Sequence, residues 1–352
     1  MAAVPQEKSL SVLQRRWRKF RTLKRGWYSL VAILVMYALS LLAPLYITNK
    51  AWVVKYNGEY TFPALSGFHA ATEFGQRTIG EADYRKLKQE FQEADAGNWV
   101  LLAPYPYHPN ESLMRSLEGR PPHSPSRAHW LGTDNRGRDV LARLVYGFRI
   151  SLTFAIGVVL LSYTLGIAVG AVLGFFGGKV DILGQRLVEI WSGLPFLYTV
   201  IIVSSLLLPS MWTLTAILAA FGWMGIAMYM RGEFYREKSK DYVAAAIAQG
   251  DSSRAIMFQQ IFPNALTPLI SFAPFAVVGA ISSLVALDFL GFGLRPPTPS
   301  WGEMVNQGLS NIFKWHLVVF PLSALFITLM MVVFIGEAIR EAFDPKVFSR
   351  LR

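Results

Sequence analysis

Six long apolar segments alternate with shorter polar segments along the chain. The hydrocarbon core of a membrane is about 30 Å thick, and about 20 mostly apolar helical residues cross it. The segments that reach this length are 27–47, 152–175, 187–208, 214–230, 267–289 and 317–335. The pattern therefore predicts an all-α polytopic membrane protein with six transmembrane helices.

The residues 48–128, after the first apolar segment, form the one sizeable stretch outside the predicted membrane helices. Within it Tyr84, Leu87 and Phe91 recur at helical spacing, which predicts an amphipathic helix over 80–97. Many prolines surround this helix and favour extended or turn conformations. Because few residues are available for a core, we expect a small cap rather than an independent domain.

The residues 129–151 lead into the second apolar segment. Apolar and charged residues separate onto two helical faces: Val140, Leu141, Leu144, Val145 and Phe148 against Arg138, Asp139 and Arg143. This separation predicts an amphipathic lead-in helix with its charged face turned away from the apolar one.

Positive charge sets the expected orientation. Lys and Arg in short loops mark the cytoplasmic side, and here they concentrate in 1–26, in the loops after the second and fourth apolar segments, and in 339–352. We therefore expect both termini in the cytoplasm and the insertion 48–128 in the periplasm. The net charge of +11 then reflects topology and contact with membrane lipid, not nucleic-acid binding.

The sequence contains no catalytic or metal-binding pattern. There is no cysteine, and the five histidines are scattered, with no cluster of ligands in a metal-site pattern. Residues 174–180 resemble a phosphate loop only in part, because Leu173 stands where that motif begins with Gly and Val180 stands where it needs Ser or Thr. Any ATP chemistry must therefore come from another chain.

A polar, helix-forming loop separates the fourth and fifth apolar segments. Residues 241–250 read DYVAAAIAQG, in which the alanines favour a slim helix and Gly250 permits a sharp turn. Pro263 is expected to end a second helix before the fifth apolar segment. A membrane protein has little use for such a loop unless a cytoplasmic partner docks on it.

Four stretches in order resemble one family. Residues 129–141 read HWLGTDNRGRDVL, which is similar to the signature of inner-membrane permeases of oligopeptide, dipeptide and nickel ABC importers. The other three are RLVE at 186–189 with Pro195, the loop 241–250, and FLGFG at 289–293 followed by PPTPSWG at 296–302. The resemblance runs from His129 almost to the end of the sixth apolar segment.

The resemblance implies a type I ABC importer permease (MetI-like) with a five-helix core over 152–338 and a cytoplasmic coupling loop over 231–263. Its partners would be a second homologous permease, a cytoplasmic ATPase that binds ATP and Mg, and a periplasmic peptide-binding protein. This chain itself would carry no cofactor. The residues expected to couple it to the ATPase are Glu237, Asp241, Tyr242, Ala244, Ala245, Ala246, Gly250 and Pro263.

The chain departs from the family pattern at two places. The family's Glu in the coupling loop is replaced by Ala244, so Asp241 or Glu237 would have to make an ionic contact to the ATPase. A carboxylate that many relatives carry at the position of Leu284 is absent, and Asp288 stands one turn later. Asp288 is read either as an interfacial acid or, with Phe289 and Phe292, as part of a substrate pathway.

The residues around Asp288, together with the insertion 48–128, resemble the Yej branch of these permeases, which is linked to peptide and microcin C-type uptake. This implies a multi-pass protein of the bacterial inner membrane that moves peptides, including microcin C-like ones, into the cytoplasm by alternating access.

Two other classes stay open. An intramembrane enzyme needs a nucleophile and a base, or a metal cluster, within the membrane helices, whereas the acids here are scattered. An ion-driven secondary transporter is built from two matched halves, and no such internal symmetry is visible in the sequence.

Overall fold

The computed structural model describes residues 11–114, 116–207 and 209–344. The described chain forms two compact units. Of these residues, the first unit draws on 11–33, 152–207, 209–284 and 326–344, and the second on 34–114, 116–151 and 285–325. The ends of the expected cytoplasmic tails, 1–10 and 345–352, lie outside the described residues.

Five continuous helical stretches among the described residues are long and apolar enough to cross a membrane. They are α2 (Lys24–Tyr46), α5 (Val140–Phe176), α8 (Met211–Lys238), the stretch Ser253–Leu290 that ends in α11 (Phe262–Leu290), and α13 (His316–Phe343). The predicted all-α membrane architecture is confirmed. The lead-in helix expected over 129–151 is not separate from the membrane helix that follows it. From residue 140 on it is the start of α5, which runs without a break from Val140 to Phe176.

The third predicted membrane helix, 187–208, differs from the structure. In its place are two helices, α6 (Gly178–Ser192) and α7 (Phe196–Leu206), bent by 71° relative to each other. The bend falls at Gly193–Leu194–Pro195, because a proline disfavours helical geometry in the residue before it and cannot donate a backbone hydrogen bond. A sixth membrane crossing requires this bent pair to act as one span.

In the first unit, α6 begins nine residues earlier than predicted and includes Asp181, whose carboxylate is paired. The Asp181 carboxylate accepts hydrogen bonds from Arg231 Nε at 2.5 Å and Nη2 at 2.6 Å, and from the Tyr235 hydroxyl at 2.8 Å. Arg231 and Tyr235 belong to α8, so these bonds fix α6 against α8.

Three short helical elements and one terminal helix complete the first unit. The loop after α8 contains α9 (Asp241–Ala248), α10 (Ser253–Ala255) and the π-helical turn η2 (Ile256–Ile261). Near the N-terminus lies α1 (Val12–Thr22), which Ser11 and Gln14 cap reciprocally.

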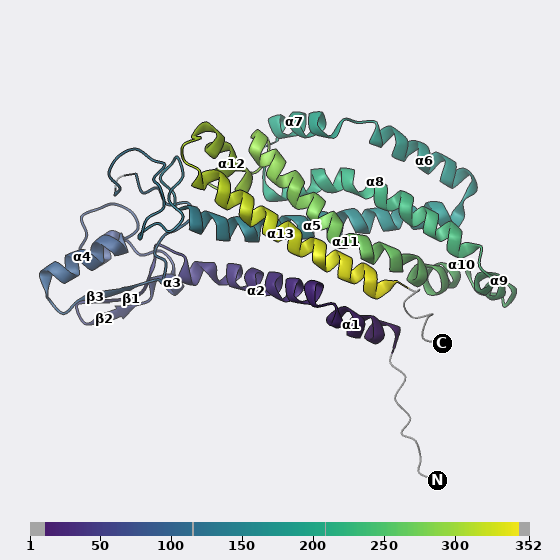
Figure 1. Ribbon diagram of the computed structural model, residues 1–352, viewed down its shortest axis with the longest axis horizontal. Coiled ribbons are helices and arrows are strands. Elements are labelled where there is room, and N and C mark those ends of the chain that lie inside the picture. Colours follow the sequence, from purple (N-terminus) through teal and green to yellow (C-terminus); the bar gives the residue numbers. More distant parts are fainter. Residues whose placement is uncertain (1–10, 115, 208, 345–352) are drawn as a thin grey trace, which may run out of the picture. The chain divides into compact units, whose positions relative to one another are not determined.

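In the second unit, the predicted amphipathic helix is present as α4 (Tyr84–Ala94), with Tyr84, Leu87 and Phe91 buried. It packs on a three-stranded antiparallel sheet that the sequence reading missed (Figure 1). The strands are β1 (Ala51–Tyr56), β2 (Glu59–Thr61) and β3 (Trp99–Leu102), in the order β2-β1-β3.

A small apolar core lies between this sheet and α4. Val54 and Val100 of the sheet and Leu87 and Phe91 of α4 belong to one buried cluster. Two short elements, α3 (Pro63–Ser66) and η1 (Ala71–Phe74), connect the second strand to α4, and Phe74 joins the same cluster. The insertion therefore has a core of its own. The second unit also contains α12 (Trp301–Ser310).

Candidate functional site

The α9 segment, residues 237–264, joins α8 to α11 and carries most of the predicted coupling residues. Val243 and Ala246 of α9 are 1% and 5% exposed and pack in a buried cluster with Met230, Phe234 and Ile261. The opposite face is exposed and carries the short side chains of Asp241, Ala244, Ala245 and Ala248 together with the larger Ile247, which is 58% exposed. Of the three predicted alanines, Ala244 and Ala245 therefore present a surface, whereas Ala246 holds the helix in place.

A polar brace fixes α9 to its neighbouring helices. Glu237, at the end of α8, accepts hydrogen bonds from Lys240 Nζ at 2.7 Å and from the Tyr242 hydroxyl at 2.9 Å. Asn264 of α11 donates to the Tyr242 oxygen at 3.3 Å and to the Gln260 carbonyl at 2.9 Å. Burial raises the pKa of Tyr242, and its bond to the Glu237 carboxylate raises it further.

The two acids that were candidates for contacting an ATPase differ in whether the brace occupies them. Glu237 is 2% exposed, and its carboxylate is occupied by Lys240 and Tyr242. Asp241, by contrast, is exposed in the first turn of α9. Of these two acids, Asp241 is therefore the one whose carboxylate is open to another chain.

Gly250 makes the turn that was predicted for it. Its φ is +83°, a left-handed conformation that glycine adopts without the cost of a Cβ. The Gly250 N–H donates to the Ile247 carbonyl at 3.0 Å and the Asp251 N–H to the Ala246 carbonyl at 3.1 Å. This pair of bonds is the Schellman arrangement that closes a helix C-terminus.

The prediction for Pro263 is wrong. Helical structure continues from Ser253 through η2 into α11, and Pro263 lies in the first turn of α11 without ending it. Proline breaks a helix because it lacks a donor and collides with the carbonyl four residues earlier. The π-helical turn just before it shifts the hydrogen-bond register, so the missing donor is tolerated there.

A second cluster, in the other unit, is formed by the signature residues 129–143. Asp134 is fully buried, and its carboxylate accepts the backbone N–H groups of Arg136 and Arg138 at 2.9 Å and the Arg138 Nε at 2.7 Å. Arg138 then reaches Glu303 of α12 at 3.0 Å. Burial alone lowers the pKa of Arg138, but Asp134 and Glu303 outweigh burial and raise it, so the guanidinium stays charged.

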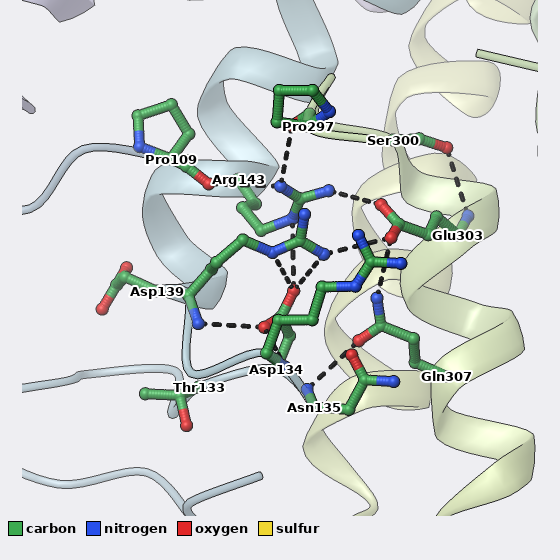
Figure 2. A network of polar contacts seen from close by, with 12 residues as sticks. Pro109, Thr133, Asp134, Asn135, Asp139, Arg143, Pro297, Ser300, Glu303 and Gln307 are labelled. Carbon is green, nitrogen blue, oxygen red and sulfur yellow. Dashed lines mark hydrogen bonds and ion pairs between the residues drawn. The ribbon is translucent and has the colours of Figure 1, made fainter. Parts of the chain in front are cut away.

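Arg143 lies at the centre of this cluster, which we call the Asp134–Glu303 network (Figure 2). The side chain of Arg143 is fully buried and donates to Glu303 Oε2 at 2.5 Å. It also donates to the carbonyls of Pro109 and Pro297, at 3.1 and 3.3 Å. One guanidinium therefore ties three segments that are far apart in sequence.

The last signature acid, Asp139, begins α5. Its Oδ1 accepts the Ala142 N–H at 2.9 Å, as a helix cap does. Its Oδ2 is bonded to the Tyr105 hydroxyl at 2.7 Å and to His129 Nδ1 at 2.8 Å. Arg138, Asp139 and Arg143 are all buried, so the charged face predicted to turn outward in 129–151 is instead enclosed by other parts of the second unit.

Asp288 is buried at the end of α11. Its Oδ1 accepts the Leu294 N–H and its Oδ2 the Ser300 hydroxyl, both at 2.6 Å. Ser300 in turn caps α12 by accepting the Glu303 N–H at 3.1 Å. The carboxylate is therefore turned into the chain rather than outward as an interfacial acid would be. Phe289 and Phe292 are half-buried nearby in sequence, and their part in a pathway stays a prediction.

Two glycines of the FLGFG and SWG stretches explain why α11 and α12 approach so closely. A Cβ at Gly293 would lie 1.8 Å from Asp288 Oδ1, and one at Gly302 would lie 2.2 Å from the Val285 carbonyl oxygen. Neither position has room for a side chain. The reading of the sequence missed Glu303, whose only local signal is its place three residues after the capping Ser300.

Comparison with known proteins defines the class. The family model of the binding-protein-dependent transport system inner membrane component matches residues 166–349. The match covers α6 to α13, including the whole α9 segment. The chain therefore belongs to this family of transport permeases, and the ABC-permease reading of its motifs is confirmed.

Individual relatives extend the similarity beyond that region. The chain is 41% identical over 337 residues to the inner membrane ABC transporter permease protein YejE of Escherichia coli (strain K12), covering 95% of this chain and 97% of the relative. It is 35% identical to the peptidoglycan transport system permease protein YejE of Agrobacterium fabrum, covering 95% and 93%. The dipeptide transport system permease protein DppC of Bacillus subtilis is 35% identical over 274 residues, covering 75% and 85%.

Proposed function

We propose that this permease carries peptides across the inner membrane into the cytoplasm as one of two related permease subunits of an ATP-driven importer. Support comes from the family and from relatives whose names include dipeptide and peptidoglycan transport. Microcin C-like peptides remain a predicted substrate within this class. ATP and Mg are bound by the partner ATPase, and a periplasmic binding protein delivers the peptide.

The proposed orientation follows from the distribution of positive charge. Both termini and the α9 segment lie in the cytoplasm, where Lys and Arg in short loops are retained. The residues 48–128, with the sheet and α4, then lie in the periplasm, where the binding protein can reach them. The small core of this insertion supports a rigid docking platform rather than a loose loop.

The observation that carries the coupling proposal is the division of α9 into two faces. Val243 and Ala246 fasten the helix to the permease, and the exposed Asp241, Ala244, Ala245 and Ile247 form the face that we propose enters a groove in the ATPase. Glu237 and Tyr242 brace the helix so that movement of the ATPase reaches α8 and α11 instead of bending the loop. Gly250 sets the angle at which the chain leaves the docked helix.

The proposed pathway residues Asp288, Phe289 and Phe292 act on the other side of the membrane. Asp288 is held by Leu294 and Ser300, so its contribution in this state is to shape the α11–α12 connection. Contact with a substrate amine would require the Ser300 bond to open as the permease alternates between its states.

A bulky side chain on the exposed face tests the docking proposal. We expect Ala244→Trp to abolish co-purification of the ATPase and vanadate-sensitive peptide uptake, because the ring projects from the face that we propose enters the groove. Ala94→Trp is the matched control for co-purification of the ATPase, since Ala94 is also an exposed helical alanine and lies outside the α9 segment. Retention of the ATPase by the Ala244→Trp variant, at the level of the control, would argue against α9 as the docking helix.

A further inference from the structure

Helix α1 combines a high positive charge with exposed apolar side chains. Its 11 residues include Arg15, Arg16, Arg18, Lys19 and Arg21 and no acid. Leu13 and Trp17 on its other face are 68% and 51% exposed. This combination is typical of helices that lie in the interface of an anionic membrane.

Unlike a free interfacial helix, α1 is fixed to the end of α13. The guanidinium of Arg16 lies 4.6 Å from the centre of the Phe343 ring, and Lys19 Nζ lies 3.3 Å from Glu341 Oε1. Phe20 is buried and stacks on Trp17. Because α1 has a defined partner surface, its side chains can form a defined site.

An apolar groove of about 380 Å³ lies between α1 and the neighbouring helices. Leu13, Trp17 and Phe20 form one wall and Ile335, Ile339 and Phe343 of α13 another, with one residue each from α2 and α11. Arg16 is the one charged residue in the lining. Three of the four lining helices are long and apolar enough to cross a membrane, so we infer that the groove opens toward lipid.

A polar cavity of about 680 Å³ shares Arg16 and Phe343 with the groove. Its lining also holds the cations Arg236, Lys240 and Arg340, and four acids equal to the four cations in number: Glu237, Glu337, Glu341 and Asp344. Arg236 is paired with Glu233 and Glu237. Two of these acids are neutralised, Glu237 by Lys240 at 2.7 Å and Glu341 by Lys19 at 3.3 Å. Within the described part of the chain, Arg340 has no ion pair or side-chain hydrogen bond.

We propose that the groove and the cavity together bind one anionic glycerophospholipid, with an acyl chain in the groove and the phosphate between Arg16 and Arg340. A ligand that fills both the apolar groove and the polar cavity must be apolar at one end and charged at the other. The five cations of α1, followed by Lys24 and Arg25, favour a negative headgroup over a zwitterionic one. Glu337 lines the same cavity and suits a hydroxyl donor, such as the glycerol of phosphatidylglycerol.

The test compares two double variants that remove the same charge. The protein is purified from membranes in its native assembly, and bound phosphatidylglycerol is measured by native mass spectrometry after titration with that lipid. We expect Arg16→Gln with Arg340→Gln to weaken binding about tenfold or more, since each basic side chain near a membrane surface contributes appreciably to anionic lipid binding. Arg18→Gln with Arg25→Gln, both exposed and outside the lining of the cavity, removes cations that attract the headgroup without contacting it, so it should weaken binding clearly less than the first pair.

Three further results decide the proposal. Equal losses in the two double variants would overturn it, because they would show diffuse attraction without a site. Tighter binding of phosphatidylethanolamine than of phosphatidylglycerol would overturn the choice of an anionic headgroup. Leu13→Gln, at an exposed position that folding does not need, should weaken binding of the lipid at unchanged thermal midpoint, and full retention of the lipid would exclude the groove as the acyl site.

Discussion

The α9 segment and the Asp134–Glu303 network hold their backbones in place by different forces. In the α9 segment the buried contacts are apolar, through Val243 and Ala246, and the polar brace of Glu237 and Tyr242 lies beside them. In the network the buried contacts are ionic, through Asp134, Arg143 and Glu303.

The two regions also differ in what they leave exposed. The α9 segment leaves Asp241, Ala244 and Ala245 exposed, whereas the charged groups of the network are paired with one another. The most highly charged motif of the sequence is therefore a structural clamp, and the run of alanines forms part of the surface that we propose for docking. Charge in a motif does not by itself locate a binding site.

Removing Arg143, the central cation of the Asp134–Glu303 network, should produce the largest loss of stability. Arg143→Met leaves the carboxylates of Asp134 and Glu303 to share the single cation Arg138, and losing one partner of a buried ion pair costs about 3–5 kcal/mol. We expect the midpoint of thermal unfolding of the purified protein to fall by roughly 6–10 °C. Docking of the ATPase on the folded fraction should persist, because α9 belongs to the other unit.

The matched control is Arg127→Met, which removes an exposed cation from the same unit and should change stability by less than about 0.5 kcal/mol. Similar midpoints for the two variants would show that the network adds little to stability. The contrast between the two regions would then lose its physical basis.

Substitutions at Asp288 separate a structural role from a role in the pathway. Asp288→Ala leaves the Leu294 N–H and the Ser300 hydroxyl without an acceptor, which costs about 2 kcal/mol. Asp288→Asn keeps an acceptor for the Leu294 N–H and a polar partner for Ser300, so we expect less than about 1 kcal/mol. Thermal midpoints and peptide uptake are measured on both variants.

If the carboxylate only shapes the α11–α12 connection, the Asn variant transports peptide normally and the Ala variant fails in proportion to its lost stability. Loss of uptake by a fully stable Asn variant would instead assign the negative charge to the substrate pathway. That result would extend the comparison, because one buried acid beside the network would then have a direct function.

The membrane helices were predictable because a long apolar run has one dominant solution in a bilayer. The small sheet was not recognised, although Asn57 and Gly58 between β1 and β2, at φ of 50° and 87°, are the residue pair that two-residue hairpin turns favour. The bend at Pro195 was underestimated for a related reason: hydropathy ignores which backbone groups can bond.

The candidate site was predictable only where its signals are local. The turn at Gly250 follows from one residue and its helix. The partner of Arg138 and Arg143 is Glu303, 165 and 160 residues away, and no local periodicity can supply such a pairing. The roles of Ala244 and Ala246 separate only when the cluster around Val243 is known, because the two residues have the same side chain.

A substitution at Gly250, in the α9 segment, should have the smallest effect of the three and concerns transport rather than stability. Gly250→Ala places a Cβ in open space but forces a left-handed conformation that costs an L-residue about 1–2 kcal/mol. Because Gly250 is exposed and outside the buried cluster, this cost alters the preferred angle of the turn and leaves the global fold intact. We expect uptake to fall roughly two- to tenfold at unchanged thermal midpoint, as the loop spends less time in the docked geometry.

Gly232→Ala is the control, since Gly232 lies within α8, has space for a Cβ and has helical geometry that alanine favours. It should transport peptide as the unsubstituted protein does. If the Gly250→Ala variant loses stability and keeps its uptake, Gly250 stabilises the fold, as the residues of the Asp134–Glu303 network do. A loss of uptake alone would show that a strained turn in an apolar, partner-facing segment affects coupling, whereas charge removed from the buried network affects stability.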